Sequence, residues 1–225
     1  QHWKITGQLP ERWLMSYQNL KFWIKLTPFK HTGLFSEQAA QWQWIQSVIG
    51  KRAMMKQSEP PKILNLFAYT GLASLAAAVS GAEVTHLDAS HSSIAWAKDN
   101  QIASGLENKP IRWILDDAIK FCQREVRRGK KYHGIMMDPP AYGHGPEGEV
   151  WKFNESFPQL MSLCQQLLAD DPLFLLVNAY AISASALMLE NVIYDTVEKL
   201  GGTIEVGELA LQHTNSTRLL STGIF

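Results

Sequence analysis

Short apolar segments alternate with longer amphipathic segments from residue 62 onward, and this alternation restricts the fold more than any other feature of the chain. Strands are predicted at 63–67, 84–87, 111–114, 134–137 and 173–177. Helices are predicted at 72–79, 92–103, 118–128 and 155–168, with another reaching about residue 200 before two short closing strands. Strands separated by helices form parallel sheets with crossover connections. We therefore predict an α/β fold with a doubly wound, mostly parallel sheet of seven strands.

A hairpin and a helix are predicted ahead of this region. Apolar and polar residues alternate in 12–17 and in 20–26, which is typical of two antiparallel strands. The segment 36–52 predicts a helix that Ser36 caps. The predicted apolar face of that helix contains Ala40, Trp44, Ile45 and Val48.

A proline-containing break at 57–61 divides the chain. We expect residues 1–57 to form an appendage made of the hairpin and the helix, and residues 58–225 to form the main domain. The chain lacks an initiator Met and stops at Phe225 within a strand-like run, so we expect both ends to be trimmed.

The composition excludes several classes of protein. The chain has 21 Lys and Arg residues and 21 Asp and Glu residues. It therefore lacks the overall basic charge that is typical of a duplex-binding module. Cys122 and Cys164 are too few for a zinc site or a disulfide framework, and each lies on an apolar helical stripe. We expect both thiols to be buried and the protein to be cytoplasmic. Polar residues interrupt the apolar run 173–189, and the N-terminus has no apolar signal core, so no membrane span is expected.

Polar or glycine-containing loops follow the predicted strands. In a parallel sheet, ligands bind beyond the carboxyl ends of the strands, near the point where the strand order reverses. The candidate cofactor-binding residues in these loops are Phe67, Ala68, Tyr69, Thr70, Gly71, Asp88, Ala89, Ser90, Asp116, Asp117, Ala118 and Asp138. Phe35 is a further candidate, because the segment 30–35 is expected to close over the cleft. We predict that these residues converge on one crevice.

The first three loops differ in what they offer a ligand. Gly71 opens a helix whose N–H groups face the ligand, but the three glycines that clear a pyrophosphate are missing, which favours a ligand without phosphates. The Asp88 carboxylate either accepts hydrogen bonds from two ribose hydroxyls or caps the next helix. One of Asp116 and Asp117 caps a helix, and the other accepts a hydrogen bond from an adenine amino group. Spacing alone does not choose between them.

The loop Asp138-Pro139-Pro140 carries the most specific signal. The prolines fix the backbone and lack N–H donors, so carbonyl acceptors accompany the Asp138 carboxylate in the cleft. This arrangement suits an amine or ring-nitrogen donor, and Tyr142 suits stacking on a planar base; a rigid turn is the alternative. The glycine-rich segment 143–148 predicts a flexible flap. We assign catalysis to Asp138, Pro139, Pro140 and Tyr142, and substrate binding to Lys30, Tyr142 and Trp151.

Taken in order, these segments resemble the class I S-adenosylmethionine-dependent methyltransferases. Segment 63–71 resembles the first cofactor motif, Asp88 the ribose-binding acid, 117–118 the adenine-side motif and 138–140 the catalytic loop. The set is similar, more narrowly, to the ribosomal RNA large-subunit methyltransferase I-like group, whose Lys-Thr-Gly-Phe-Phe-like segment corresponds to 30–35 here. The similar region runs from there to the C-terminus. The resemblance implies S-adenosylmethionine as the cofactor and a Rossmann-like catalytic domain.

Two departures separate the chain from that group. Residues 1–29 are too short for the RNA-binding PUA domain that the group carries at its N-terminus. Residues 177–181 lack the cysteine that attacks the ring in relatives that methylate carbon five of cytosine. The resemblance therefore implies methyl transfer to a nucleic-acid base, with ribosomal RNA as the expected substrate, without specifying the nucleotide.

Three other functions are compatible with the residues. A nicotinamide-dependent oxidoreductase uses the same kind of sheet, although the missing glycines oppose it. A non-catalytic RNA-binding domain would use a basic stretch that otherwise forms a solvated helix face. That stretch consists of Arg124, Arg127, Arg128, Lys130 and Lys131. Methylation of a protein or a small molecule is the third alternative, because a fold does not fix its substrate.

Overall fold

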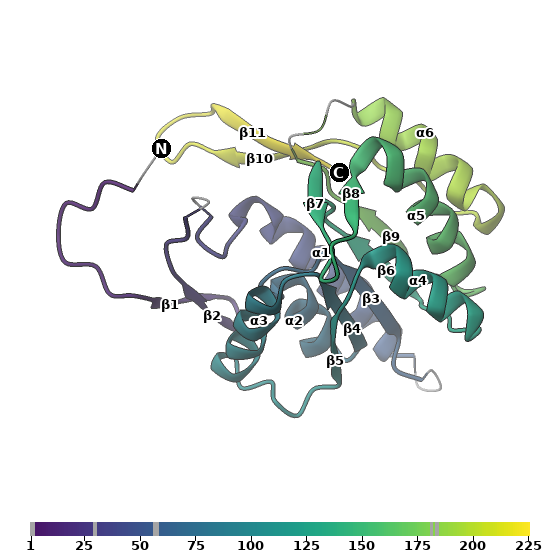
Figure 1. Cartoon of the computed structure of the whole chain (residues 1–225), viewed down its shortest axis with the longest axis horizontal. Helices are drawn as coiled ribbons and strands as arrows, with labels where there is room; N and C mark the ends of the chain where they lie inside the picture. The colour runs from purple at the N-terminus through teal and green to yellow at the C-terminus, as the bar shows by residue number, and fades with distance from the viewer. Residues whose placement is uncertain (1–2, 29–30, 56–58, 181, 183–184) are drawn as a thin grey trace.

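The computed structural model describes residues 3–28, 31–55, 59–180, 182 and 185–225. Among these residues, the central parallel sheet consists of β3 (Lys62–Leu66), β4 (Glu83–Asp88), β5 (Ile111–Leu115), β6 (Gly134–Met137) and β9 (Phe174–Val177). The strand order is β5-β4-β3-β6-β9, so the chain builds outward from β3 in both directions (Figure 1). The predicted doubly wound α/β fold is confirmed, and the strand order reverses between β3 and β6.

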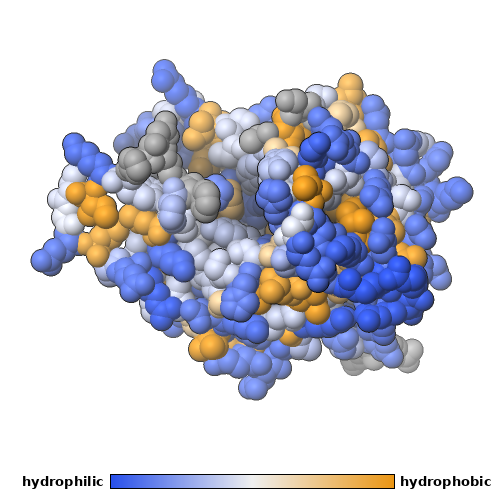
Figure 2. All heavy atoms as spheres, viewed as in Figure 1, coloured by the Kyte–Doolittle hydropathy of each residue, from blue (hydrophilic) through white to orange (hydrophobic). Residues whose placement is uncertain are grey.

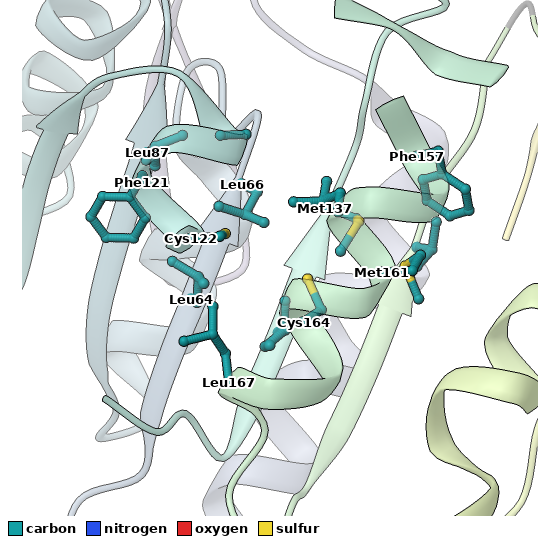
Figure 3. Packing of buried hydrophobic residues seen from close by; sticks show 14 of the residues in the cluster. Leu64, Leu66, Leu87, Phe121, Cys122, Met137, Phe157, Met161, Cys164 and Leu167 are labelled. Atoms are coloured by element: carbon teal, nitrogen blue, oxygen red, sulfur yellow. The ribbon is translucent and has the colours of Figure 1, made fainter. Parts of the chain in front are cut away.

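Helices cover both faces of the sheet. One face carries α1 (Ala39–Ala53), α2 (Leu72–Val79) and α3 (His91–Ala103), and the other carries α4 (Ala118–Arg127), α5 (Phe153–Leu167) and α6 (Ala186–Val197) (Figure 1). Because side chains alternate along a strand, β3 supplies both cores. Ile63 packs with α1 and α2, whereas Leu64 and Leu66 pack with α4 and α5 (Figure 3). Cys122 and Cys164 are buried in the second core, as predicted.

The sheet has five strands in the described part of the chain, and the prediction of seven is not confirmed. The two closing strands, β10 (Glu208–Gln212) and β11 (Leu219–Ile224), exist but pair with each other in a separate antiparallel hairpin. A backbone pair between Ala179 and Ile224 joins this hairpin to the segment after β9. Alternating apolar residues identify a strand but not its partner, because the partner is chosen by contacts that are distant in sequence.

The predicted N-terminal hairpin is confirmed as β1 (Trp13–Tyr17) and β2 (Leu20–Ile24). Leu20, Phe22 and Ile24 are buried against α1 and α2. The backbone N–H of Trp23 donates to Asn100 Oδ1 of α3 over 2.8 Å. The hairpin is therefore fixed to the helical layer beside α3 (Figure 1).

The start and the buried face of α1 differ from the prediction. Ser36 begins a 3₁₀ turn, Ser36–Gln38, and makes no capping hydrogen bond. Trp44 is 44% exposed, whereas Gln41 and Trp42 are buried. The buried face is rotated because Gln41 pairs with Asn178 of the loop after β9, a polar contact that hydrophobic periodicity does not reveal.

The Gln41–Asn178 pair predicts a stability effect. Each amide donates to the other, over 2.6 Å and 3.0 Å, and both side chains are buried. Gln41→Ala leaves the Asn178 amide unpaired, so we expect the free energy of unfolding to fall by about 2 kcal/mol. Urea denaturation measures this loss. Ser47→Ala, on the exposed side of the same helix, is the control and is expected to change stability by less than about 0.5 kcal/mol.

Hydrophilic residues cover most of the face shown in Figure 2, and hydrophobic residues form separate patches on it. Within the described ranges, no helix combines the length and the apolar character needed to cross a bilayer. Two smaller elements complete the fold: the 3₁₀ turn Glu198–Leu200 after α6, and a short hairpin formed by β7 (Tyr142–His144) and β8 (Val150–Lys152). The predicted division of the chain between residues 57 and 58 lies outside the described residues and stays a prediction.

Candidate cofactor and substrate site

The loop after β3 has an unusual backbone. Phe67 and Tyr69 have positive φ angles of 53° and 48°, and Gly71 begins α2 with a φ of 85°. A β-carbon on Gly71 would lie 2.9 Å from the Ala97 β-carbon of α3. Gly71 is therefore required by its left-handed conformation and by close packing between helices, a reason that its place in the sequence did not reveal.

Asp88, at the end of β4, joins two of the predicted cofactor loops. Its Oδ2 accepts from the Tyr69 N–H and its Oδ1 accepts from the Ser90 N–H, each over 2.8 Å. Burial raises the pKa of Asp88, and these two N–H donors act in the opposite direction. Ser90, and not Asp88, caps α3, because the Ser90 hydroxyl accepts from the Ser93 N–H. Each carboxylate oxygen keeps an acceptor site, which fits a ribose diol.

Thr70 and Ala68 hold the same loop in place. The Thr70 hydroxyl donates to the Gly33 carbonyl over 2.8 Å, and the Thr70 carbonyl accepts from Asn100 over 2.9 Å. The Ala68 N–H donates to the Leu87 carbonyl of β4. Thr70 is buried, so its side chain connects the loop to the Gly33 segment.

Asp117 caps α4, since its carboxylate accepts from the Lys120 N–H over 2.9 Å. Asp116 forms an ion pair with Arg124, and its N–H donates to the Asp88 carbonyl over 3.2 Å. The structure thus settles that Asp117 caps the helix, and the backbone hydrogen bond places Asp116 beside Asp88. Contact of either acid, or of Ala118, with adenine stays a prediction.

Asp138 follows β6 and faces α1. Its Oδ2 accepts from the Gln38 side-chain amide over 2.8 Å, and the same amide lies 3.2 Å from the Tyr180 hydroxyl. The pKa of Asp138 is raised to about 7, and burial is the largest cause. The Gln38 hydrogen bond lowers this pKa, and the negative charge of Glu37 raises it. Asp138 therefore holds a proton that it exchanges near neutral pH.

Phe35 is at the centre of a group of rings that includes Tyr180, whose hydroxyl contacts Gln38. Its ring centroid lies 5.4 Å from His31, 5.9 Å from Tyr69 and 5.5 Å from Tyr180. Tyr180 and Gln38 were absent from the predicted site. Two signals pointed to them: Tyr180 lies in a strand-end loop, and Gln38 follows the segment predicted to close the cleft.

The β7–β8 hairpin packs against residues 138–140, which we call the proline loop. Trp151 is buried, its indole N–H donates to the Pro140 carbonyl over 2.6 Å, and its ring lies 4.8 Å from Phe67. Pro139 is buried, whereas Pro140 is exposed. Trp151 thus occupies a supporting position, and its predicted contact with substrate stays untested. The predicted flexible flap contains a paired hairpin, whose Glu147 and Glu149 form ion pairs with Lys120 of α4.

Trp151→Phe tests this supporting contact. The variant keeps an aromatic ring against Phe67 but loses the N–H donor to Pro140. We expect the single-turnover rate of methyl transfer to fall about tenfold, because the proline loop is less firmly positioned, while cofactor affinity is unchanged. Trp44→Phe, on the exposed face of α1, is the control and is expected to keep the full rate. Equal rates for both variants would contradict the assignment.

Seven of the predicted residues line one cavity beside the reversal point of the sheet. This cavity is lined by the loop 67–71 together with Phe35 and Asp138, and Gln38 and Asn178 extend its wall. Asp88 joins this group through Tyr69. Tyr142 is 57% exposed beside the proline loop, where its hydroxyl lies 3.3 Å from His144. Lys30 lies outside the described residues.

Comparison with known proteins agrees with this geometry. The family profile described as S-adenosylmethionine-dependent methyltransferase matches residues 2–200. The chain therefore belongs to the S-adenosylmethionine-dependent methyltransferase family. A crystal structure of a SAM-dependent methyltransferase from Agrobacterium tumefaciens is 42% identical, with a TM-score of 0.91, over 97% of this chain and 70% of that one.

Two curated relatives carry more specific names. Ribosomal RNA large subunit methyltransferase K/L of Shewanella baltica is 35% identical over 131 residues, which are 57% of this chain and 17% of that protein. Ribosomal RNA large subunit methyltransferase K of Neisseria meningitidis is 26% identical over 180 residues, which are 79% of this chain. The chain spans 48% of the length of that second relative.

The residues present suit the family's cofactor. Asp88 offers acceptor sites to a ribose. The rings of Phe35, Tyr69 and Tyr180 suit a positively charged sulfur, because aromatic faces attract cations. S-adenosylmethionine therefore fits the site by its diol and by its charge.

Proposed function

We propose that this protein transfers a methyl group from S-adenosylmethionine to a base of RNA, and that the RNA is ribosomal RNA. The observation that carries the proposal is Asp138, whose carboxylate lies at the reversal point of the sheet and already accepts a side-chain amide N–H from Gln38. The names of the Shewanella and Neisseria relatives support RNA as the substrate. The free, buried thiols agree with the cytoplasmic location that we propose.

The chain's own groups account for the orientation of the acceptor base. The cofactor supplies an electrophilic methyl group. Asp138 Oδ1 has no partner among the described residues, so it accepts an N–H of the acceptor base while Oδ2 stays on Gln38. Tyr142, exposed beside Pro140, stacks on the base. Positioning provides most of the rate enhancement, because displacement at a sulfonium needs little acid–base assistance.

Label transfer tests the proposal directly. The protein is incubated with radiolabelled cofactor and with total RNA from a strain that lacks the gene, and the labelled nucleotide is mapped. Label in one ribosomal RNA position is the expected result. Label recovered in protein or in small molecules, with none in RNA, would contradict it. The same incubation with RNA from the parent strain is the control, because its target position is already methylated.

The pKa of Asp138 predicts a pH dependence. The carboxylate form accepts the N–H of the base, so kcat/KM is expected to rise with pH and to level off above about 7. Glu37→Gln removes a negative charge that raises this pKa, and we expect the midpoint of the profile to move to lower pH with the plateau retained. A profile that is flat between pH 5 and pH 9 would argue against a role for the carboxylate.

A further inference from the structure

A second hollow lies between the N-terminal hairpin and α3, away from the cofactor cavity. We call it the hairpin pocket and define it by Arg12, Trp23, Lys25, His91, Trp96 and Asp99. Its volume is about 320 Å³, which is within the range of small-ligand pockets, roughly 300–1,000 Å³. No step of the methyl transfer described above uses these residues.

The walls of the hairpin pocket pair each of two cations with a tryptophan. The Arg12 guanidinium carbon lies 4.2 Å from the centroid of the Trp23 ring, and Lys25 Nζ lies 4.3 Å from that of Trp96. The Trp96 indole N–H donates to the Trp23 carbonyl over 2.9 Å, which fixes the two tryptophans relative to each other. Basic side chains next to aromatic faces are the combination that binds single-stranded nucleic acid.

The hairpin pocket adjoins the catalytic edge of the sheet. His91 begins α3 directly after the loop that carries Asp88, and the Trp96 ring lies 6.1 Å from Tyr69. The Lys25 N–H donates to the Thr32 carbonyl, in the segment that leads to Phe35. If the target base of an RNA strand enters the cofactor cavity, a neighbouring nucleotide of that RNA would therefore lie at the hairpin pocket.

We propose that the hairpin pocket binds a single-stranded segment of the RNA substrate next to the target base. Arg12 and Lys25 contact phosphate oxygens, and a flanking base stacks on the partly exposed ring of Trp23, while the buried Trp96 holds Trp23 in place. This inference rests on RNA being the substrate. A chain with no net charge needs a local basic site to attract a polyanion, and this pocket supplies two cations beside the catalytic edge.

Asp99 gives the proposal a specific electrostatic signature. Its carboxylate pairs with Arg12 over 3.0 Å, and both side chains are about half exposed. A phosphate must compete with this carboxylate for the guanidinium. Removing the carboxylate should therefore strengthen RNA binding, whereas removing the cations should weaken it. A purely structural role of the pocket would make both changes neutral or harmful.

The basic stretch near α4 is the competing RNA surface. Arg124 pairs with Asp116, Arg128 pairs with Glu125, and Lys131 donates to backbone carbonyls. Arg127 and Lys130 are exposed and form no ion pair with other described residues. Most of the stretch is thus engaged in intramolecular contacts. Arg127 and Lys130 provide a control that removes the same charge.

Equilibrium binding of a fluorescein-labelled 12-nucleotide single-stranded RNA to the whole chain tests the proposal. Arg12→Gln with Lys25→Gln is expected to weaken binding roughly tenfold in 0.1 M salt and to reduce the salt slope by about 1.4, which corresponds to two phosphate contacts. Asp99→Asn is expected to tighten binding several-fold. Arg127→Gln with Lys130→Gln is expected to stay within twofold of the unmodified chain.

Three results would overturn the inference: unchanged affinity after loss of Arg12 and Lys25, weaker binding by Asp99→Asn, or a larger loss after removal of Arg127 and Lys130. An abasic 12-residue strand tests the stacking, since equal affinity for it would exclude a base on Trp23. Methyl transfer is measured separately. If RNA is methylated and its KM is unchanged by Arg12→Gln with Lys25→Gln, the pocket fails and the proposed function stands. If the pocket binds RNA but no RNA is methylated, the proposed function fails alone.

Discussion

Asp138→Asn is expected to reduce the single-turnover rate of methyl transfer by at least about a hundredfold. The substitution keeps the shape of the side chain and an acceptor for Gln38, but it removes the negative charge that we propose holds the N–H of the acceptor base. Cofactor affinity, measured by calorimetry, is expected to stay within about threefold. Loss of cofactor binding with normal transfer from bound cofactor would refute this role of Asp138.

The same variant is expected to be more stable than the parent chain at alkaline pH. The pKa of Asp138 is raised from 3.8 to about 7, so the folded chain keeps a proton that the unfolded chain loses between those values. Stability therefore decreases as pH rises through this window. At pH 8 the Asn variant is expected to gain about 4 kcal/mol, and at pH 4 it is expected to gain less than about 1 kcal/mol. Urea denaturation at both pH values measures the difference.

Asp88→Ala is expected to weaken S-adenosylmethionine binding by at least about a hundredfold, because the carboxylate that we propose accepts the ribose hydroxyls is lost. The change also leaves the Tyr69 and Ser90 N–H groups without their partner, so a loss of affinity could arise from a loosened loop. Asp195→Ala, which removes an exposed carboxylate on α6, is the control for general charge loss and is expected to bind the cofactor normally.

A ligand comparison separates the two causes for Asp88. The parent chain is expected to bind 5′-methylthioadenosine much more tightly than its 2′,3′-dideoxy analogue. The Asp88→Ala variant is expected to bind both equally weakly, because the carboxylate that distinguishes them is gone. If the variant still discriminates between the two nucleosides, the ribose assignment of Asp88 is wrong.

Sequence periodicity was sufficient to predict the five parallel strands and the loops at their carboxyl ends. Gly71, Asp88 and Asp138 follow buried strands, and parallel strands bring their carboxyl ends to one edge. The partner of the β10–β11 hairpin was not predictable in the same way. Strand pairing depends on contacts between distant segments, and these strands satisfy each other's backbone groups.

The contacts that complete the site were also beyond the sequence. Gln38 meets Asp138 across 100 residues of chain, and Gln41 meets Asn178 across 137. Neither pair leaves a periodic signal, because each joins one polar side chain to another through the fold alone. The burial of Trp151 was not predictable either, because it depends on the pairing of β7 with β8, which brings the Trp151 indole to the Pro140 carbonyl.

The N-terminal end of α1 bridges two strand-end loops. Gln38 contacts the loop after β6, and Gln41, about one helical turn later, contacts the loop after β9. A small axial shift of this helix would displace both contacts together, so the two loops cannot be tuned independently. Directed evolution toward another acceptor should accordingly randomise residues 38, 41 and 178 as one unit.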